Sequence, residues 1–361
     1  METQRKTIFI TGGAGYVGEM LCEQFSKRDD VKEIITLDKE PQSDFSKSIP
    51  KLTYIQQNMA DCGWQEMVAK HHPDTVIHTA WQIRAMYGNP KEQWRWNVDG
   101  SDNIFDFAIT TDSVKKIIYF STASSYSARK DNRFEHLFTE DEGFRDDDYI
   151  YAHEKKVTEE HLAAKFAESG RTDLQVVVVR PAAVTGPRGR YMRIRFGLQS
   201  ALQGNLKGNP VYKVVTLLTA FVPATKGWVR QFIHEDDVND LVQHFTFNDA
   251  PSKYEVYNIT PVSEPVYAAD MANAVGKKIL PITPTMARLA FFGFWHATRG
   301  KVPTCAGSWR FYSYPVLMSG EKLATQYTCT FSSKDAFQYT DGRYESYVPE
   351  ELKRSKQQQS K

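Results

Sequence analysis

Thr11-Gly12-Gly13-Ala14-Gly15-Tyr16-Val17-Gly18 is the stretch that decides the fold of this chain. The apolar run at 7–10 before it is typical of a strand, and Leu21 and Phe25 after it share one helical face. Because glycine lacks a Cβ, a glycine turn lets backbone N–H groups approach a pyrophosphate at the positive end of a helix. The stretch therefore predicts the first half of a dinucleotide-binding βαβ unit.

An acidic residue follows at the expected distance. A second strand at 33–37 ends at Asp38, twenty residues after Gly18. A carboxylate there accepts hydrogen bonds from the adenosine ribose and repels a 2′-phosphate, which favours NAD over NADP. The competing interpretation is a surface aspartate that ends a strand, and the basic neighbour Lys39 weakens discrimination against NADP.

The bulk composition excludes several classes of protein. Among 361 residues, 45 Lys and Arg against 44 Asp and Glu give a formal charge of +1, which does not favour binding to nucleic acid or to a bulk membrane surface. Four scattered cysteines have no metal-ligand spacing, so reduced thiols and no metal are expected. No apolar run is long enough to span a bilayer and no signal peptide is recognised at the amino terminus. We therefore expect a cytoplasmic protein that acts on a small molecule.

The remaining pattern alternates strands with helices. Strands are expected at 52–55, 75–80, 116–120 and 174–179, and helices at 64–70, from 97 onward and at 150–168. This rhythm predicts an α/β fold with a Rossmann-type, doubly wound parallel sheet. The glycine turn, Ala80 and Thr122 then converge at the carboxyl ends of the strands, where such sheets bind ligands. His78, alone in an apolar strand, is interpreted as a hydrogen-bonded core histidine rather than a ligand.

Tyr151 and Lys155 form the chemistry-bearing pair. They lie four residues apart near the start of the 150–168 helix and therefore share one face. A nearby ammonium stabilises phenolate, so we expect Lys155 to lower the pKa of Tyr151 for acid–base work. Two other Tyr-x-x-x-Lys matches, at 87–91 and 126–130, lack a helical context.

With these motifs the chain resembles the extended short-chain dehydrogenase/reductase family, which includes NAD-dependent sugar-nucleotide epimerases and dehydratases. The resemblance covers roughly residues 7–260. Besides the motifs above, it rests on His78-Thr79-Ala80, Asn97-Val98-x-Gly100, Ser121-Thr122-Ala123, Arg180-Pro181-x-x-Val184-x-Gly186-Pro187 and Arg230-Gln231-Phe232-Ile233-His234-x-x-Asp237.

The resemblance implies roles for individual residues. Tyr151 transfers the proton, Lys155 holds the nicotinamide ribose, and Thr122 binds the reacting oxygen. The implied cofactor contacts are Gly12, Gly15, Tyr16, Val17, Gly18, Asp38, Asn58, Met59, Ala80, Asn97, Tyr151, Lys155, Pro181 and Val184. The implied substrate contacts are Thr122, Ser124, Arg190 and Arg230.

The resemblance also implies a domain organisation. Residues 1–185 form an NAD-binding domain to which 229–260 return, 186–228 and 261–348 form a smaller C-terminal substrate-binding lobe, and 349–361 form a disordered polar tail. A homodimer is expected through the helices that begin near Asn97 and Ile150.

Departures from the family leave the reaction open. Ala123 and Ser124 stand where dehydratases carry acidic residues, which favours an epimerase or a simple dehydrogenase. The arginines at 188–195 either grip an anionic substrate or form a solvated helix face, and the aromatic stretch 286–298 is interpreted as core ahead of pocket lining or membrane contact. The leading hypothesis is epimerisation of a nucleotide-linked sugar. The alternatives are a dehydrogenase or reductase of a hydrophobic alcohol or ketone, of the 3β-hydroxysteroid or flavonoid kind, and a non-catalytic NAD-binding sensor or scaffold.

Overall fold

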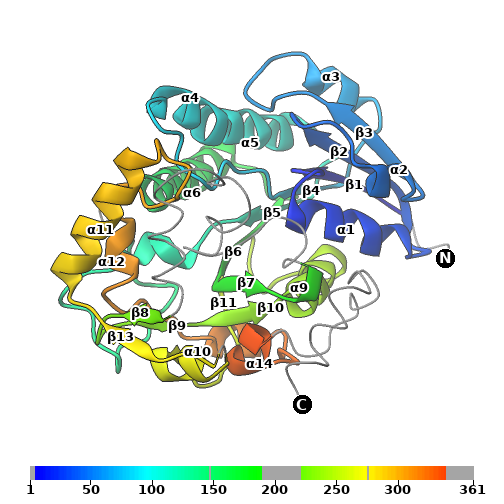
Figure 1. Cartoon of the computed structure of the whole chain (residues 1–361). Helices are drawn as coiled ribbons and strands as arrows, with labels where there is room; N and C mark the ends of the chain where they lie inside the picture. The colour runs from blue at the N-terminus through cyan, green and yellow to red at the C-terminus, as the bar shows by residue number, and fades with distance from the viewer. Residues whose placement is uncertain (1–4, 146–147, 189–220, 275, 339–361) are drawn as a thin grey trace.

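A parallel sheet of seven strands forms the centre of the molecule (Figure 1). The structure is a computed structural model that describes residues 5–145, 148–188, 221–274 and 276–338. The strands of the sheet are β1 (Lys6–Thr11), β2 (Val31–Asp38), β3 (Leu52–Gln56), β4 (Thr75–His78), β5 (Lys116–Phe120), β6 (Gln175–Pro181) and β11 (Tyr254–Ile259). Their order is β11-β6-β5-β4-β1-β2-β3.

The strand order reverses between β1 and β4. These strands are neighbours in the sheet, with Thr11 opposite His78. The chain proceeds outward from β1 through β2 and β3, and outward from β4 through β5 and β6. This arrangement confirms the predicted doubly wound sheet, and it opens a crevice at the carboxyl ends of β1 and β4.

Helices cover both faces of the sheet because consecutive apolar side chains of a strand project to opposite faces, so that both faces are apolar. Ile8 and Ile10 point to the face covered by α1 (Tyr16–Ser26) and α9 (Glu235–Phe247), whereas Phe9 points to the opposite face. The opposite face is covered by α5 (Gly100–Thr110) and α6 (Ile150–Ser169) (Figure 1). The shorter helices are α2 (Asp44–Lys47), α3 (Trp64–Ala69), the 3-10 helix η2 (Ala123–Tyr126), α10 (Ala268–Ala274), α12 (Ser308–Phe311), α13 (Glu321–Ala324) and α14 (Ser333–Gln338).

The helix expected from residue 97 begins earlier. It starts as α4 (Pro90–Trp94), continues through a π-helical turn, η1 (Arg95–Asp99), and ends as α5. Pro90 suits the first helical turn because its ring fixes φ and no N–H donor is needed there. The expected start was wrong because Pro90, which lies within the 87–91 match, was interpreted only as a residue that interrupts helices.

Short strand pairs connect the chain beyond β6. β7 (Ala183–Thr185) pairs with β10 (Phe232–His234), β8 (Val222–Ala224) with β13 (Ile279–Pro281), and β9 (Val229–Arg230) with β12 (Val266–Tyr267). The chain then re-enters the main sheet at β11, next to β6. The division into a cofactor domain and a substrate lobe stays a prediction, and the tail at 349–361 lies outside the described residues.

The aromatic stretch forms α11 (Pro284–Ala297), and its interpretation as core is wrong. Ala287 is the helix's one buried residue, while Leu289 is 67% exposed and Phe292 is 66% exposed. The reason is geometric: α11 rests on α12 at the edge of the molecule rather than between layers (Figure 1). No helix among the described residues is long and apolar enough to cross a membrane.

Candidate active site

The glycine turn packs too closely for side chains. A Cβ on Gly18 would lie 2.1 Å from the carbonyl oxygen of Gly12, and a Cβ on Gly12, whose φ is +82°, would lie 2.9 Å from the backbone nitrogen of Ala80. Gly15 donates its N–H to the Gly12 carbonyl at 2.9 Å. The turn therefore brings bare backbone to the start of α1, which fits the predicted approach of a pyrophosphate.

Tyr16 and Val17 open helix α1. The Tyr16 side chain is buried, and its hydroxyl donates a hydrogen bond to Glu235 at the start of α9. Glu235 also accepts the backbone N–H of Arg188 at 2.9 Å. The Tyr16 side chain thus fixes α1 to α9, which leaves its backbone for the predicted cofactor contact.

Asp38 lies beside the glycine turn. Its carboxylate accepts the N–H of Ala14 at 3.0 Å and the N–H of Glu40 at 2.9 Å. Burial raises the pKa of Asp38, and both hydrogen bonds oppose that rise. Lys39 pairs with Glu40, and its Nζ lies 4.6 Å from the centre of the Trp96 ring.

Thr11 and His78 join β1 to β4 at the crevice. His78 is 1% exposed, and its ring nitrogens hydrogen-bond Thr11 at 2.7 Å and Ser101 at 2.8 Å. Its interpretation as a hydrogen-bonded core histidine is confirmed. The Thr11 hydroxyl also accepts the N–H of Ala80 at 3.2 Å, which holds Ala80 against the glycine turn.

Asn58 and Met59, predicted to contact adenine, follow β3. Asn58 caps its own turn by accepting the N–H of Ala60 at 2.9 Å. Met59 is 8% exposed and packs against Gly100, where a Cβ would lie 2.8 Å from its Cγ.

Asn97 is fully buried within the π-helical turn. Its side-chain amide donates to Glu154 at 2.7 Å and to the carbonyl of Gln82 at 3.1 Å, and its side-chain oxygen accepts the N–H of Gln82 at 2.7 Å. These bonds engage both ends of the amide, so the side chain positions the segment after β4 and the residue before Lys155.

Thr122, Tyr151 and Lys155 come together at the carboxyl end of β5. The Thr122 hydroxyl lies close enough to the Tyr151 phenol to lower its pKa. Lys155, one turn along α6, is 3% exposed and donates to the carbonyl of Phe120. Helix α6 thus delivers the phenol and the ammonium, and the segment after β5 delivers the hydroxyl.

The electrostatics of this trio differ from the expectation. Burial raises the pKa of Tyr151, opposed by its hydrogen bond to Thr122, whereas a lowering by Lys155 was expected. Burial also lowers the pKa of Lys155 well below its usual range, with Glu159 and Glu154 opposing. The expectation failed because the ammonium is directed at a backbone carbonyl and because both groups lose hydration.

Trp81, directly after Ala80, is a site residue that the sequence reasoning missed. Its ring lies 3.7 Å from Nζ of Lys155 and meets the Tyr151 ring edge-on at 6.4 Å. Within the described residues its buried indole N–H has no hydrogen-bond partner. Its position at the carboxyl end of a central strand was the available signal.

Arg230 lies on β9 among aromatic side chains. Burial lowers its pKa to about 10, and the phenols of Tyr312 and Tyr149 partly offset that effect. The Tyr149 ring in turn lies tilted beside the Tyr151 ring, with centroids 5.7 Å apart. Among the described residues Arg230 forms no ion pair with Asp or Glu.

The other predicted residues are dispersed. Ser124 donates its backbone N–H to the Thr122 hydroxyl at 3.1 Å, and Pro181 ends β6. Val184, in β7, pairs with Ile233 of β10. Arg188 is buried and pairs with Glu23 at 2.7 Å, so it belongs to neither interpretation of the arginine cluster. Arg190 lies outside the described residues.

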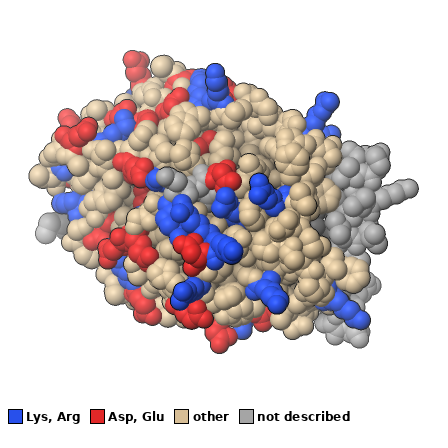
Figure 2. Space-filling model, turned by 90° about the vertical axis from the view of Figure 1, so that its left-hand side faces the viewer, with Lys and Arg blue, Asp and Glu red and all other residues tan. Residues whose placement is uncertain are grey.

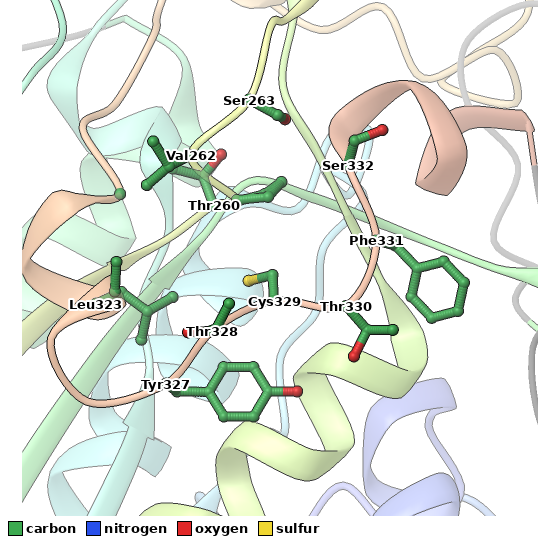
Figure 3. A pocket seen from close by; sticks show the side chains of 13 residues that line it. Thr260, Val262, Ser263, Leu323, Tyr327, Thr328, Cys329, Thr330, Phe331 and Ser332 are labelled. Carbon is green, nitrogen blue, oxygen red and sulfur yellow. The ribbon is translucent and has the colours of Figure 1, made fainter.

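A cavity of about 240 Å³ lies elsewhere, beyond the end of β11 (Figure 3). Figure 3 shows Thr260, Val262 and Ser263 facing the loop that carries Tyr327 and Cys329. None of its lining residues is a predicted site residue. It is therefore not a part of the candidate active site.

Comparison with known proteins places these features in a family. Residues 8–260 match the NAD dependent epimerase/dehydratase family. A curated relative, UDP-N-acetyl-alpha-D-glucosaminuronate decarboxylase of Bacillus cytotoxicus, is 28% identical over 218 residues, which cover 56% of this chain and 63% of the relative. The match thus spans less than two thirds of that relative's length.

Solved structures share the fold at lower identity. The enzyme WbmG of Bordetella bronchiseptica in complex with NAD is 20% identical with a TM-score of 0.68, over 96% of each chain. UDP-glucose 4-epimerase of Thermotoga maritima with UDP-glucose is 19% identical with a TM-score of 0.64, over 95% of this chain and all of that one. The family description agrees with NAD as the predicted cofactor, and the match over most of the sequence shows that this chain belongs to the NAD dependent epimerase/dehydratase family.

Proposed function

We propose that the protein oxidises a secondary alcohol of a nucleotide-linked sugar with NAD and then reduces the product again, with net epimerisation. The observation that carries the proposal is the placement of the Thr122 hydroxyl beside the Tyr151 phenol, with Lys155 one helical turn along α6 from Tyr151. The family assignment supports the same class of chemistry.

The proton chemistry belongs to Tyr151. Its phenolate takes the proton of the alcohol oxygen as the carbon is oxidised, and later returns that proton to the carbonyl oxygen when the hydride is delivered to the opposite face of the carbon. Thr122 donates a hydrogen bond to the reacting oxygen as negative charge develops there. NAD, when bound, accepts the hydride from the alcohol carbon and gives it back.

The geometry of the crevice supports the cofactor contacts that we propose. The bare backbone of the glycine turn would hold the pyrophosphate, Asp38 the adenosine ribose, and Lys155 the nicotinamide ribose. Lys155 is buried beside Trp81, so a ribose hydroxyl there meets an ammonium shielded from water.

Arg230 supports an anionic substrate. Arg230 is half-buried and forms no ion pair with Asp or Glu among the described residues, so an anionic group would stabilise its partly desolvated guanidinium. A nucleotide diphosphate supplies that anion and, through its sugar, the alcohol. The decarboxylase of Bacillus cytotoxicus and the epimerase of Thermotoga maritima are both named for UDP-sugars.

The residues after Thr122 oppose elimination chemistry. Ala123 and Ser124 supply no carboxyl group for removing a proton beside a ketone, so dehydration is disfavoured. The second candidate is oxidation or reduction of a hydrophobic alcohol, and the exposed apolar side chains of α11 favour it. A non-catalytic NAD sensor requires that Tyr151 perform no proton transfer.

Mass spectrometry of material that co-purifies with the full chain tests the substrate class. The expected result is a UDP- or TDP-sugar together with NAD. Recovery of an apolar alcohol or ketone instead, with no nucleotide sugar, would support the second candidate and contradict the proposal.

We also propose a homodimer formed through α5 and α6. Within one chain these helices are linked by His161 with Asp102 at 2.9 Å and by Lys165 with Asp106 at 2.6 Å. Sedimentation of the purified chain as a monomer at micromolar concentration would contradict the dimer.

A further inference from the structure

Helix α11 carries an apolar face that the described residues do not cover. Met286 is 52% exposed, Leu289 is 67% exposed and Phe292 is 66% exposed. Their three-residue spacing places them on successive turns of one side of the helix. Large apolar side chains grouped in this way mark an interaction surface more often than scattered ones do.

The opposite face of α11 is firmly attached. The Phe291 ring lies 5.6 Å from that of Tyr312, and the Trp295 ring lies 5.3 Å from that of Tyr87. Thr283 caps the helix by accepting the N–H of Met286 at 3.2 Å. The helix is therefore a fixed platform with one face packed and one face presented outward.

The sequence around α11 has one sign of charge. Residues 271–320 contain no Asp or Glu, although 44 acids in 361 residues predict about six in such a stretch. The same residues contain six cations: Lys277, Lys278, Arg288, Arg299, Lys301 and Arg310. Among them Lys278, Arg288, Arg299 and Lys301 are exposed.

The surface view agrees with this distribution. Figure 2 looks onto the side of the molecule that carries α11 in Figure 1. Its right-hand part is mostly tan with scattered Lys and Arg, while most Asp and Glu lie toward the left and the lower edge. An apolar surface with cations and few anions complements a partner that has an apolar interior and a negatively charged outer layer.

We propose that α11 docks the protein on an anionic lipid bilayer, with Met286, Leu289 and Phe292 inserted at the boundary between headgroups and acyl chains. An amphipathic helix lies in this plane when its apolar face is buried and basic residues meet anionic headgroups. The aromatic ring of Phe292 and the stem of Arg288 suit that depth. The inner face of α11 contacts Tyr312, the neighbour of Arg230, so docking brings the candidate site to the lipid surface.

Cosedimentation of the full chain with vesicles tests this inference without a substrate. The wild type is expected to bind phosphatidylcholine vesicles that contain phosphatidylserine, to bind phosphatidylcholine alone more weakly, and to dissociate as salt is raised. A Leu289→Glu/Phe292→Glu double variant should lose affinity by about 10-fold or more, because two apolar anchors are replaced by charges repelled from the membrane.

Matched controls separate docking from misfolding. Met67→Glu places a charge at a side chain that is 41% exposed on α3, at the other end of the molecule, and should bind vesicles as the wild type does (Figure 1). The circular dichroism spectrum and the melting temperature of the double variant should match those of Met67→Glu, since the replaced side chains are exposed.

Three results would overturn the inference. The wild type could fail to cosediment with the anionic vesicles, or the double variant could bind as the wild type does. The third is a wild-type dimer that the double variant converts to a monomer in sedimentation velocity, which would assign the face to a second copy of the chain. None of these results bears on the proposed sugar chemistry, because NAD reduction is measured separately.

Discussion

The glycine turn and helix α11 are built on opposite principles. In the turn, a Cβ on Gly13 would lie 2.0 Å from the Thr36 hydroxyl and a Cβ on Gly18 would lie 2.1 Å from the Gly12 carbonyl. On α11, a Cβ on Gly293 would meet nothing within 4 Å among the described residues. In the first region, close approach of the backbone restricts which residues fit. In the second region, packing restricts the residues only on the inner face of the helix. Close approach leaves a sequence signature, and a free face does not.

Replacing Gly18 by alanine tests the crowded side of this comparison and should have the largest effect on stability. The added methyl must displace backbone, so we expect a loss of about 2–3 kcal/mol in the free energy of unfolding. NAD affinity should fall as well, because the turn must open. Chemical denaturation and calorimetric titration with NAD measure the two effects, and unchanged values of both would refute the account of the turn.

Replacing Lys155 by methionine tests whether burial in the crevice disfavours the charged form of the Lys155 side chain. The pKa of Lys155 is lowered in the folded protein, so the unfolded chain binds more protons and wild-type stability gains from rising pH. The variant lacks this group, so the wild type should gain stability relative to it as the pH rises from the lowered pKa of the folded protein toward the usual lysine pKa of about 10.

Denaturation of both proteins across this range measures the difference in unfolding free energy. Parallel pH curves would contradict the lowered pKa. The variant should also lose activity, which a purely structural lysine would not require.

Replacing Gly293 by alanine should have the smallest effect, with the opposite sign. The position is helical and its surroundings are open, so alanine should stabilise the protein by about 0.5–1 kcal/mol through helix propensity. A melting-temperature comparison with Gly18→Ala makes a matched pair of glycine-to-alanine changes. A destabilised Gly293→Ala protein would mean that something packs on this face.

Much of the fold could be predicted because hydrophobic period and glycine spacing are local signals. Six of the seven strands of the sheet follow from them directly, as does the placement of Tyr151 and Lys155 on one helix, whereas strand β11 (Tyr254–Ile259) was not predicted. The start of the long helix at Pro90 was missed because residue type alone does not distinguish a proline that begins a helix from one that breaks it.

The features of the site that the sequence did not predict all depend on contacts between segments that are distant in the chain. The hydrogen bonds of Asn97 to Glu154 and the ring of Trp81 over Lys155 join segments far apart in the chain. The raised pKa of Tyr151 depends on burial, which residue spacing does not report. The exposure of α11 was missed for the same reason, since aromatic composition alone predicts core.

The most direct test of the central claim compares wild type and Tyr151→Phe for reduction of NAD by nucleotide sugars. The near-ultraviolet absorbance of reduced nicotinamide is followed after mixing each protein with NAD and UDP- or TDP-sugars. The wild type should show a transient rise in reduced cofactor of at most one equivalent per site, because epimerisation returns the hydride to the sugar, and Tyr151→Phe should form it at least ~100-fold more slowly while it still binds NAD. Equal rates in the two proteins, or no reduction by the wild type with any of these sugars, would contradict the claim.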